Sequence, residues 1–317
     1  MLPEIPFKLT IENIVNKMNI YLGEKLLEKD NCKFESAIKT IFIVFFLTYG
    51  LHYFGYFVRL RYYNFLETLH LSEGVSHVFG YLGHLIFLLV YILYALAVKS
   101  DRKYFLSVFK ESAGKNIKKA FLGVLIGFCL MGICIFAASA HGDITVGSAS
   151  DTNYVLFIFA LVAVFLQASI EEVETRGFVF AKLMDEGVSF KWSVVCSALF
   201  FAYIHATNPG FGFLPLLSIF VVGLQYVLIY YYFGNLWLTF GAHAMWNFTQ
   251  DFIFGLPDSG KPAAVSIFNT TVSGSSFFYD KDFGIEGSLM AILVNAAVCV
   301  LVFAIGNYLK RRQKGEA

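Results

Sequence analysis

The chain has 317 residues, of which 57% are hydrophobic, 18% aromatic and 15% charged, and its mean hydropathy is +0.65. Soluble domains carry roughly 45–50% apolar and about 25% charged residues, so this composition excludes an ordinary soluble protein and indicates an integral membrane protein. The net charge of +1, without basic runs interleaved with aromatic residues, argues against nucleic-acid binding. Five cysteines without a CxxC pair indicate neither a disulfide framework nor a thiolate metal site.

The first 36 residues contain Lys and Glu throughout and no apolar core segment, which argues against a cleavable signal peptide. Apolar residues recur there at helical spacing, with polar residues between them, and predict an amphipathic helix. Such a helix lies either on the membrane surface or against the bundle as a solvated cap. Its apolar positions are Ile11, Ile14, Val15, Met18 and Leu22.

A membrane-spanning helix needs about 20 largely apolar residues. Candidate segments lie near 38–58, 78–98, 120–140, 154–182, 191–207, 214–233, 236–254 and 287–309. They predict an all-α fold, a polytopic transmembrane helix bundle of about eight spans. The chain then divides into an amphipathic N-terminal segment (1–36), three transmembrane helices (37–150), a core (151–254), an outer loop (255–286) and a last helix with a basic tail (287–317).

The distribution of Lys and Arg predicts the topology, because cytoplasmic loops carry an excess of these residues. They gather between the second and third spans and after the last span, at Lys99, Arg102, Lys103, Lys110, Lys115, Lys118, Lys119, Lys310, Arg311, Arg312 and Lys314. Both regions are predicted to be cytoplasmic, and an even number of spans places the N-terminus there too. The connection 141–151, which lacks Lys and Arg, is predicted outside, as is the 255–286 loop, a lid or a packed cap. Arg59 and Arg61 are exceptions, because they follow the first span, where the predicted topology places the chain outside.

Two adjacent glutamates, Glu171 and Glu172, follow the apolar run 154–170, and Arg176 comes one helical turn later. At i, i+4 spacing, Glu172 and Arg176 can pair on one helix face. Glu171 points about 100° away around the helix and is left for another partner. The Glu172 and Arg176 pair by itself is as consistent with a structural ion pair as with a functional site.

Two further apolar segments each contain a single histidine. Phe201 precedes His205 by one turn and would wall its face, and Asn247 follows His243 by one turn. At 1.5 Å per residue, Glu171, His205 and His243 lie roughly 16, 21 and 12 Å from the inner ends of their helices. These depths fall near the middle of a hydrocarbon core about 30 Å thick. A single membrane histidine is often only a helix–helix partner, but ionisable groups from three helices at one depth predict a shared functional site.

These side chains allow two forms of hydrolysis. Glu171 can take a proton from water while His205 orients that water, and His243 and Asn247 can donate hydrogen bonds to an oxyanion. Alternatively, Glu171, His205 and His243 form a His₂Glu ligand set for a divalent metal such as Zn²⁺, with a position left for water. The residues leave both forms open. The remaining histidines receive no role: His52, His70, His77, His84 and His141.

The patterns E-E-x-x-x-R, F-x-x-x-H and H-x-x-x-N resemble the motifs of the CPBP intramembrane proteases, a family named for CAAX proteases and bacteriocin-processing enzymes and also called Abi. The resemblance covers roughly residues 154–252. It implies an α-helical membrane peptidase that is often classed as a metalloprotease, although the use of a metal is unsettled in the family. Thr175 departs from the aromatic residue that many members carry before the arginine, which bears on pocket packing and substrate choice.

The resemblance also implies roles for individual residues. Glu171 and His205 activate water, His243 and Asn247 stabilise the oxyanion, and two further residues support the site: Glu172 and Arg176. The chain contains no H-E-x-x-H, no G-x-S-G and no paired G-x-G-D and Y-D, so the Glu/His chemistry is the remaining proteolytic option.

We therefore expect an intramembrane endopeptidase with a site in the middle or cytoplasmic half of the bilayer. Its expected partners are membrane lipid and a membrane-associated peptide or protein substrate, with or without a lipid anchor. Three alternatives use the same residues. They are a catalytically silent scaffold or immunity protein, a proton- or ion-coupled transporter, and a haem cytochrome with His205 and His243 as axial ligands.

Overall fold

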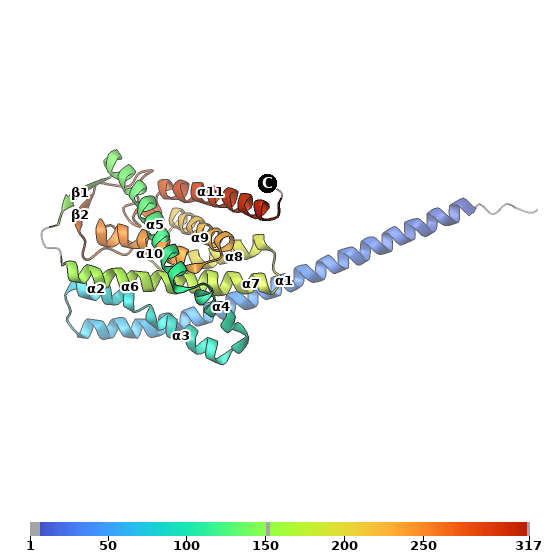
Figure 1. The fold of residues 1–317 in the computed structure, drawn as a ribbon, viewed down its shortest axis with the longest axis horizontal. Helices are drawn as coiled ribbons and strands as arrows, with labels where there is room; N and C mark the ends of the chain where they lie inside the picture. Colours follow the sequence, from blue (N-terminus) through green and yellow to red (C-terminus); the bar gives the residue numbers. More distant parts are fainter. Residues whose placement is uncertain (1–6, 150–152, 316–317) are drawn as a thin grey trace, which may run out of the picture.

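The computed structural model describes the backbone of residues 7–149 and 153–315, with side chains from residue 35 onward. Figure 1 shows a bundle of helices running back and forth. The α-helices are α1 (Phe7–Thr68), α2 (Glu73–Leu82), α3 (Leu85–Ala97), α4 (Arg102–Leu106), α5 (Ala113–His141), α6 (Tyr154–Glu172), α7 (Ala181–Asp185), α8 (Phe190–Tyr203), α9 (Phe213–Phe233), α10 (Leu236–Phe248) and α11 (Leu289–Gln313). Two π-helical turns, η3 (Val173–Phe180) and η4 (Thr249–Ile253), continue α6 and α10. Three short 3₁₀ turns are η1 (Lys99–Asp101), η2 (Ser107–Phe109) and η5 (Ile285–Gly287).

Every segment predicted to span the membrane is helical, which confirms the polytopic helix bundle. Among the described residues, six helical segments are long and apolar enough to cross a membrane: Glu35–Thr68, Glu73–Ala97, Ala113–His141, Tyr154–Asp185, Phe213–Phe233 and Leu289–Gln313. The predicted spans 191–207 and 236–254 form shorter helices. With 14 residues, α8 is about 21 Å long and stops within a hydrocarbon core of about 30 Å.

The N-terminal segment and the first span form one helix. Helix α1 runs from Phe7 to Thr68, and the part long and apolar enough to cross a membrane is Glu35–Thr68. The predicted amphipathic face from Ile11 to Leu22 lies outside the residues whose side chains are described.

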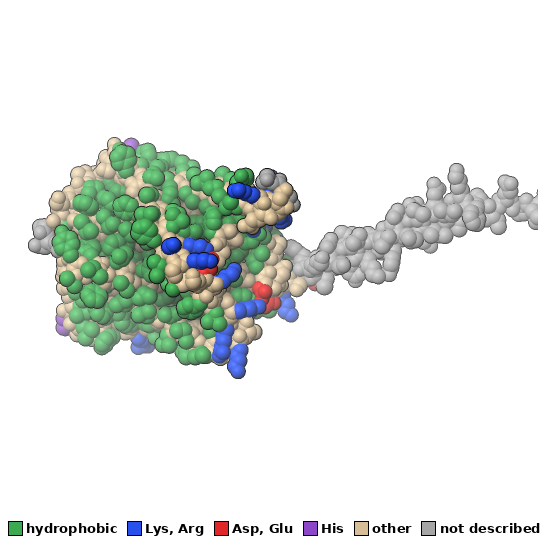
Figure 2. All heavy atoms as spheres, in the orientation of Figure 1, with side chains coloured by type: hydrophobic (Ala, Val, Ile, Leu, Met, Phe, Trp, Pro, Cys, Tyr) green, Lys and Arg blue, Asp and Glu red, His purple; other side chains and the backbone are tan. Residues whose placement is uncertain are grey.

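Large apolar side chains cover the sides of the bundle, as Figure 2 shows. Phe46, Phe136 and Val300 are 63%, 75% and 70% exposed. Lys and Arg gather toward the end of the bundle that contains α4, α7 and the end of α11. Because soluble monomers rarely expose so much contiguous apolar surface, this surface is that of a lipid-facing protein with one basic end.

Helix α10 packs closely between α5 and α6. A Cβ atom added to Gly127 of α5 would lie 2.2 Å from the carbonyl oxygen of Ala242, and one added to Gly241 of α10 would lie 2.0 Å from that of Ala120. The two backbones therefore touch, as small residues allow in membrane helices. This approach fixes the depth and rotation of α10, which contains His243.

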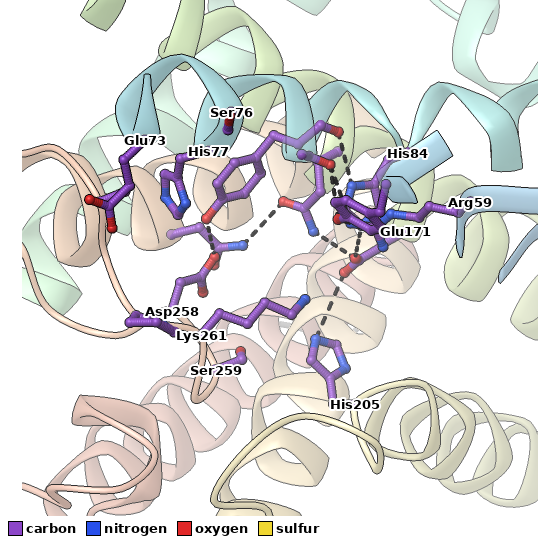
Figure 3. A pocket seen from close by; sticks show the side chains of 17 residues that line it. Arg59, Glu73, Ser76, His77, His84, Glu171, His205, Asp258, Ser259 and Lys261 are labelled. Carbon is purple, nitrogen blue, oxygen red and sulfur yellow. Dashed lines mark hydrogen bonds and ion pairs between the residues drawn. The ribbon is translucent and has the colours of Figure 1, made fainter. Parts of the chain in front are cut away.

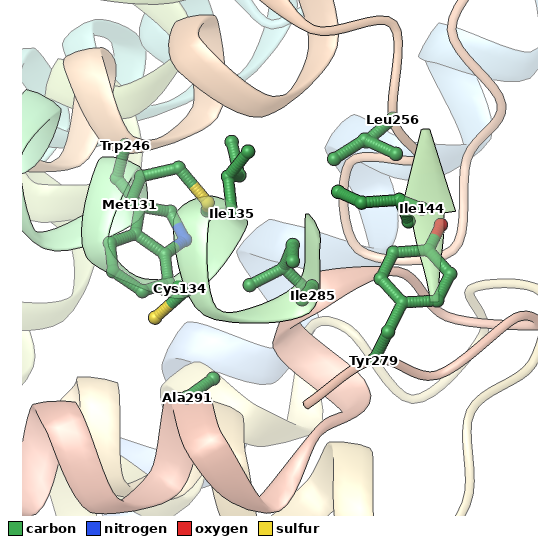
Figure 4. Packing of buried hydrophobic residues seen from close by; sticks show 10 residues of the cluster. Met131, Cys134, Ile135, Ile144, Trp246, Leu256, Tyr279, Ile285 and Ala291 are labelled. Carbon is green, nitrogen blue, oxygen red and sulfur yellow. The ribbon is translucent and has the colours of Figure 1, made fainter. Parts of the chain in front are cut away.

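The 255–286 loop is packed onto the bundle. Strands β1 (Ile144–Ser148) and β2 (Phe268–Val272) pair antiparallel, so the two connections predicted to be outside lie on the same side. Figure 4 shows side chains of this loop packed with those of α5, β1 and α10. The loop residues in this cluster are Leu256, Tyr279 and Ile285, and none of them is exposed.

Candidate active site

Glu171 and Glu172 are the last two residues of α6, where the α-helix passes into the π-helical turn η3. Such turns are rare and frequently occur at functional sites. Glu172 is fully buried and Glu171 is 8% exposed. A buried carboxylate is costly unless it has hydrogen-bond donors or a cation beside it. The residues that contact these two carboxylates therefore define the site.

Arg176 is fully buried and holds several elements together. Its Nη1 donates to Glu172 Oε1 at 2.8 Å and to Thr175 Oγ1 at 2.7 Å, and its Nη2 donates to the carbonyl oxygen of Gly223 at 3.0 Å. The guanidinium carbon lies 4.3 Å from the centre of the Phe201 ring. The predicted pairing of Glu172 with Arg176 is therefore present, and Thr175 supplies a hydrogen bond that the sequence did not reveal.

His243 of α10 is oriented by Glu172. Its Nδ1 lies 3.0 Å from Glu172 Oε1, and its ring stacks on Tyr226 with 5.3 Å between ring centres. Its Nε2 then lies 3.9 Å from Glu171 Oε2.

His205 follows the end of α8 and faces the same carboxylate oxygen. Its Nδ1 lies 2.8 Å from the carbonyl oxygen of Phe201, an acceptor, and its Nε2 lies 4.0 Å from Glu171 Oε2. Since the Nδ1 of each ring meets an acceptor, the neutral form of each ring carries its hydrogen on Nδ1 and a lone pair on Nε2. Glu171 Oε2 is buried and has no hydrogen-bond partner among the described residues. The structure thus brings Glu171, His205 and His243 together around one oxygen.

The other oxygen of Glu171 is held by a residue that sequence reasoning missed. Gln167 Nε2 donates to Glu171 Oε1 at 2.6 Å, and Asn247 Nδ2 donates to Gln167 Oε1 at 3.3 Å. Asn247 is therefore joined to Glu171 through Gln167. A signal for Gln167 was present, because it is a polar residue in an apolar run one helical turn before Glu171.

His84 also belongs to this site, although no role was predicted for it. It lies at the break between α2 and α3, with Nδ1 3.0 Å from the carbonyl oxygen of Tyr81 and Nε2 3.6 Å from Glu171 Oε1. Figure 3 shows His84 and His205 approaching Glu171 from different elements. No local spacing links His84 to the three motifs, so only the fold could reveal it.

A neighbouring cluster ties α1 and α3 to η3. Glu174 Oε1 accepts a hydrogen bond from the Tyr91 hydroxyl at 2.6 Å and lies 3.0 Å from His52 Nδ1. This contact gives His52 an acidic partner that the sequence did not predict.

Two adjoining cavities, of about 370 and 530 Å³, meet at Glu171. The smaller is lined mainly by residues of α2 and the 255–286 loop, and the larger by residues of α1, several of them tyrosines, and of the segment 203–209. Both are lined by the same six residues where they meet: Arg59, Tyr63, His84, Glu171, His205 and Lys261.

The cavities lie away from the basic end of the bundle. None of their lining residues comes from the basic end, and the 255–286 loop contributes to both. On the predicted topology this is the outer side. Helix α8 stops short, so His205 lies near the 255–286 loop, and Lys261 of that loop lines the same cavities. The site in the middle or cytoplasmic half of the bilayer stays a prediction, because it depends on the orientation of the bundle.

The donor atoms were tested for a fit to a metal ion. Glu171, His205 and His243 are suitable ligand types for zinc. However, bonds of about 2.0–2.1 Å in a tetrahedral site place ligand atoms roughly 3.3 Å apart, whereas the Nε2 atoms lie 3.9 and 4.0 Å from Glu171 Oε2. Among the described residues, no group of three or more His, Cys, Asp or Glu side chains is placed to hold a metal ion. The residues as arranged do not fit the ion.

The core of the chain is similar to a known protein family. Residues 153–249 match the family model described as Type II CAAX prenyl endopeptidase Rce1-like. This range contains every residue of the three motifs and confirms the resemblance to the CPBP proteases over the core of the chain. At a coarse level it supports a protease. No curated protein matches the chain.

Proposed function

We propose that this protein is an intramembrane endopeptidase that hydrolyses a peptide bond of a membrane-associated or lipidated protein or peptide. The observation that carries the proposal is Glu171 Oε2, a buried carboxylate oxygen without a hydrogen-bond donor among the described residues. It is faced by the Nε2 atoms of His205 and His243. Glu172 Oε2 and Asp251 Oδ1 are also buried without a partner in the described part of the chain, so the feature that distinguishes Glu171 Oε2 is the pair of imidazole nitrogens that faces it.

The spacing around Glu171 suits a water nucleophile. Separations of 3.9 and 4.0 Å are too long for direct hydrogen bonds, and each fits a water about 2.8 Å from both atoms. Glu171 accepts the proton as this water attacks the scissile carbonyl, and His205 Nε2 orients the water through its lone pair. Gln167 fixes the other oxygen of Glu171, so the carboxylate is held in place before the substrate binds.

The opposite side of the site supplies hydrogen-bond donors for the oxyanion. The Asn247 amide gives one hydrogen to Gln167 and has a second for the substrate. His243 donates from Nε2 when both of its ring nitrogens are protonated, and Glu172 at Nδ1 supports that state. Donors fixed before the reaction stabilise developing charge most effectively.

A lipidated substrate fits the larger cavity. Its wall includes Tyr53 and Leu60 of α1 and Tyr203 of α8, which are 60%, 42% and 41% exposed. Because these side chains belong to the lipid-facing surface, an acyl or prenyl chain can follow them from the bilayer to Glu171.

Proteolysis in liposomes tests the proposal. Fluorogenic peptides with and without a lipid anchor are given to the wild type, Glu171→Gln and His205→Ala. His141→Gln, which changes a histidine that is half exposed at the surface, serves as the control. We expect cleavage by the wild type and the control, and a loss of at least about 10³-fold in the other two.

Two other results of this assay would contradict the proposal or its premise. Equal cleavage by all four proteins points to a contaminating protease, and a folded wild type that cleaves none of the peptides favours the scaffold reading. A parallel series with chelator and with added Zn²⁺ tests metal dependence.

A further inference from the structure

The junction of the two cavities contains two cationic side chains that the proposed mechanism does not use. Arg59 of α1 and Lys261 of the 255–286 loop line both cavities beside Glu171. Neither lies in the matched range 153–249. In Figure 3, Lys261 reaches from the loop toward Glu171 and His205, and Arg59 lies on the far side of Glu171.

Neither cation has a counterion. Among the described residues, no carboxylate lies within 4.0 Å of either one, and Lys261 Nζ makes no hydrogen bond. Arg59 Nη2 donates only to the neutral oxygens of Tyr63 and Gly80, and its Nε is buried without a partner. Lys261 keeps an exposed surface, while its burial against the cavity wall and next the charge of Arg59 lower its pKa, against Asp258, Glu171 and Glu286, which raise it. At the junction, the two cations therefore have no carboxylate in contact with them among the described residues.

The turn that presents Lys261 is firmly held. Asp258 and Lys261 exchange two backbone hydrogen bonds, of 2.9 and 3.0 Å. Glu286 Oε2 accepts from the backbone nitrogen and the hydroxyl of Ser259, at 2.9 and 2.6 Å. A Cβ added to Gly260, which has a φ of +82°, would lie 1.9 Å from the carbonyl oxygen of Pro209. This packing places Lys261 over the cavity instead of leaving it on a mobile loop.

The acidic residue nearest in sequence is already engaged. Asp258 Oδ2 accepts from the Tyr81 hydroxyl at 2.6 Å, and its Oδ1 accepts from Gln250 at 2.9 Å. Asp258 therefore keeps its hydrogen bonds without Lys261, and the lysine is free to meet a ligand.

We propose that Arg59 and Lys261 form an anion-binding subsite that receives a carboxylate of the peptide substrate close to the bond that is cleaved. This inference rests on the proposed function and adds a substrate requirement to it. Arg and Lys form their strongest hydrogen bonds with ionised acceptors, and a carboxylate can bridge two separate cations. The carboxylate comes either from the C-terminus of the peptide or from an acidic side chain near its end.

Matched peptides test the subsite. The probe is an N-palmitoylated hexapeptide of Ala, Leu and Val, labelled with fluorescein, made with a free C-terminal acid, with a C-terminal amide, and as an amide with Glu as its last residue. Binding is measured by fluorescence anisotropy with full-length protein in nanodiscs. The Glu171→Gln variant is used so that no cleavage is needed.

We expect the acid to bind about tenfold or more tightly than the amide, from the usual strength of a charged hydrogen bond. Lys261→Gln and Arg59→Gln should each remove this preference, and Lys261→Arg should restore it. Lys281→Gln is the control, because Lys281 belongs to the same loop, is exposed, and lines neither cavity.

The outcomes separate the subsite from the catalytic proposal. If the amide ending in Glu binds like the acid, the carboxylate can come from a side chain, and if it binds like the plain amide, the C-terminus is required. Equal binding of acid and amide, including no binding of either, overturns the subsite. Selective binding without any cleavage by the wild type supports the subsite and contradicts the peptidase.

Discussion

At the scale of single residues, the orientation of Glu171 depends on Gln167. Removing this side chain in Gln167→Ala loses the 2.6 Å hydrogen bond to Glu171 and the contact with Asn247. A hydrogen bond to a charged group contributes about 1.5–3 kcal/mol, which corresponds to a fall in kcat of roughly 10- to 100-fold. Steady-state proteolysis checks this, with Val162→Ala on the exposed face of the same helix as the control. A change in KM alone would assign Gln167 to substrate binding instead.

The ion pair of Glu172 and Arg176 makes a second prediction. Both side chains are fully buried, so Arg176→Met leaves an unpaired carboxylate and should reduce the free energy of unfolding by about 3–5 kcal/mol. Adding Glu172→Gln should recover part of this loss, because the uncompensated charge is then removed. A thermal-unfolding double-mutant cycle in detergent measures the coupling.

The exposed pair of Lys103 and Asp185 provides the control cycle, for which a coupling of at most about 1 kcal/mol is expected. Equal coupling in the two cycles would show that burial does not strengthen the pair of Glu172 and Arg176.

Sequence reasoning found those site residues that repeat at helical spacing within one segment. Glu172 with Arg176, and Phe201 with His205, are local relations that a single helix fixes. His84, His52 and Lys261 reach the cavities through tertiary packing from segments far away in the sequence. No spacing rule relates them to the motifs. Thr175, noted only as a departure from the family pattern, proves to be a hydrogen-bond partner of Arg176.

At the scale of elements, the contact between α5 and α10 depends on glycine. In Gly127→Leu the new side chain meets the backbone of α10, since a Cβ there would lie 2.2 Å from the Ala242 oxygen. Overpacking costs about 1–3 kcal/mol or more where the backbone cannot move, so a clear fall in Tm is expected. The matched control is Gly132→Leu on the same helix, where a Cβ meets nothing within 4 Å. It should keep the wild-type Tm, and a similar fall in both would show that the loss does not come from the contact with α10.

The connection between η1 and α7 predicts a pH dependence. Lys182 Nζ lies 2.9 and 3.0 Å from the two carboxylate oxygens of Asp101, and the Tyr94 hydroxyl donates to Asp101 as well. Burial alone would raise the pKa of Asp101, but these hydrogen bonds outweigh it and leave the pKa below its usual value. The ionised form is thus favoured in the folded state. Its stabilisation is present above the unfolded pKa of about 3.9 and is lost as the pH falls through the lower folded value.

Asp101→Asn should therefore lower the free energy of unfolding at pH 7 by about 1–3 kcal/mol. The difference from wild type should shrink below about pH 4. Thermal unfolding between pH 3 and pH 7 measures this, with Asp282→Asn at an exposed position as the control. A difference that does not change with pH would show that the ionisation of Asp101 has no part in it.

The helical segments themselves were predictable because runs of about 20 apolar residues leave few alternatives. Their interruptions were not. The break between α2 and α3, which delivers His84, and the π-helical turn η3 after Glu172 lie inside continuous apolar or helical patterns. These irregularities are stabilised by tertiary contacts such as those of Arg176 and Glu174, so hydropathy does not show them.

At the scale of the whole molecule, Lys and Arg residues gather at one end of the bundle. None of those at this end lines the two cavities, whose walls include residues of the 255–286 loop. The excess of Lys and Arg predicts that the basic end faces the cytoplasm. The 255–286 loop and the approach to Glu171 then face the outside, which would restrict substrates to peptide segments exposed on that side. The orientation of the bundle in the membrane therefore decides from which side a substrate reaches Glu171.

Cysteine labelling of intact cells answers it. In a background without the native cysteines, Ser273→Cys and Lys115→Cys place single exposed thiols in the 255–286 loop and at the basic end. An impermeant maleimide should label the first directly and the second only after the membrane is permeabilised, because the positive-inside rule places Lys115 in the cytoplasm. The reverse pattern would turn the cavities toward the cytoplasm. The substrate would then reach the site from the cytoplasm. The excess of Lys and Arg would in that case not determine the orientation of the bundle.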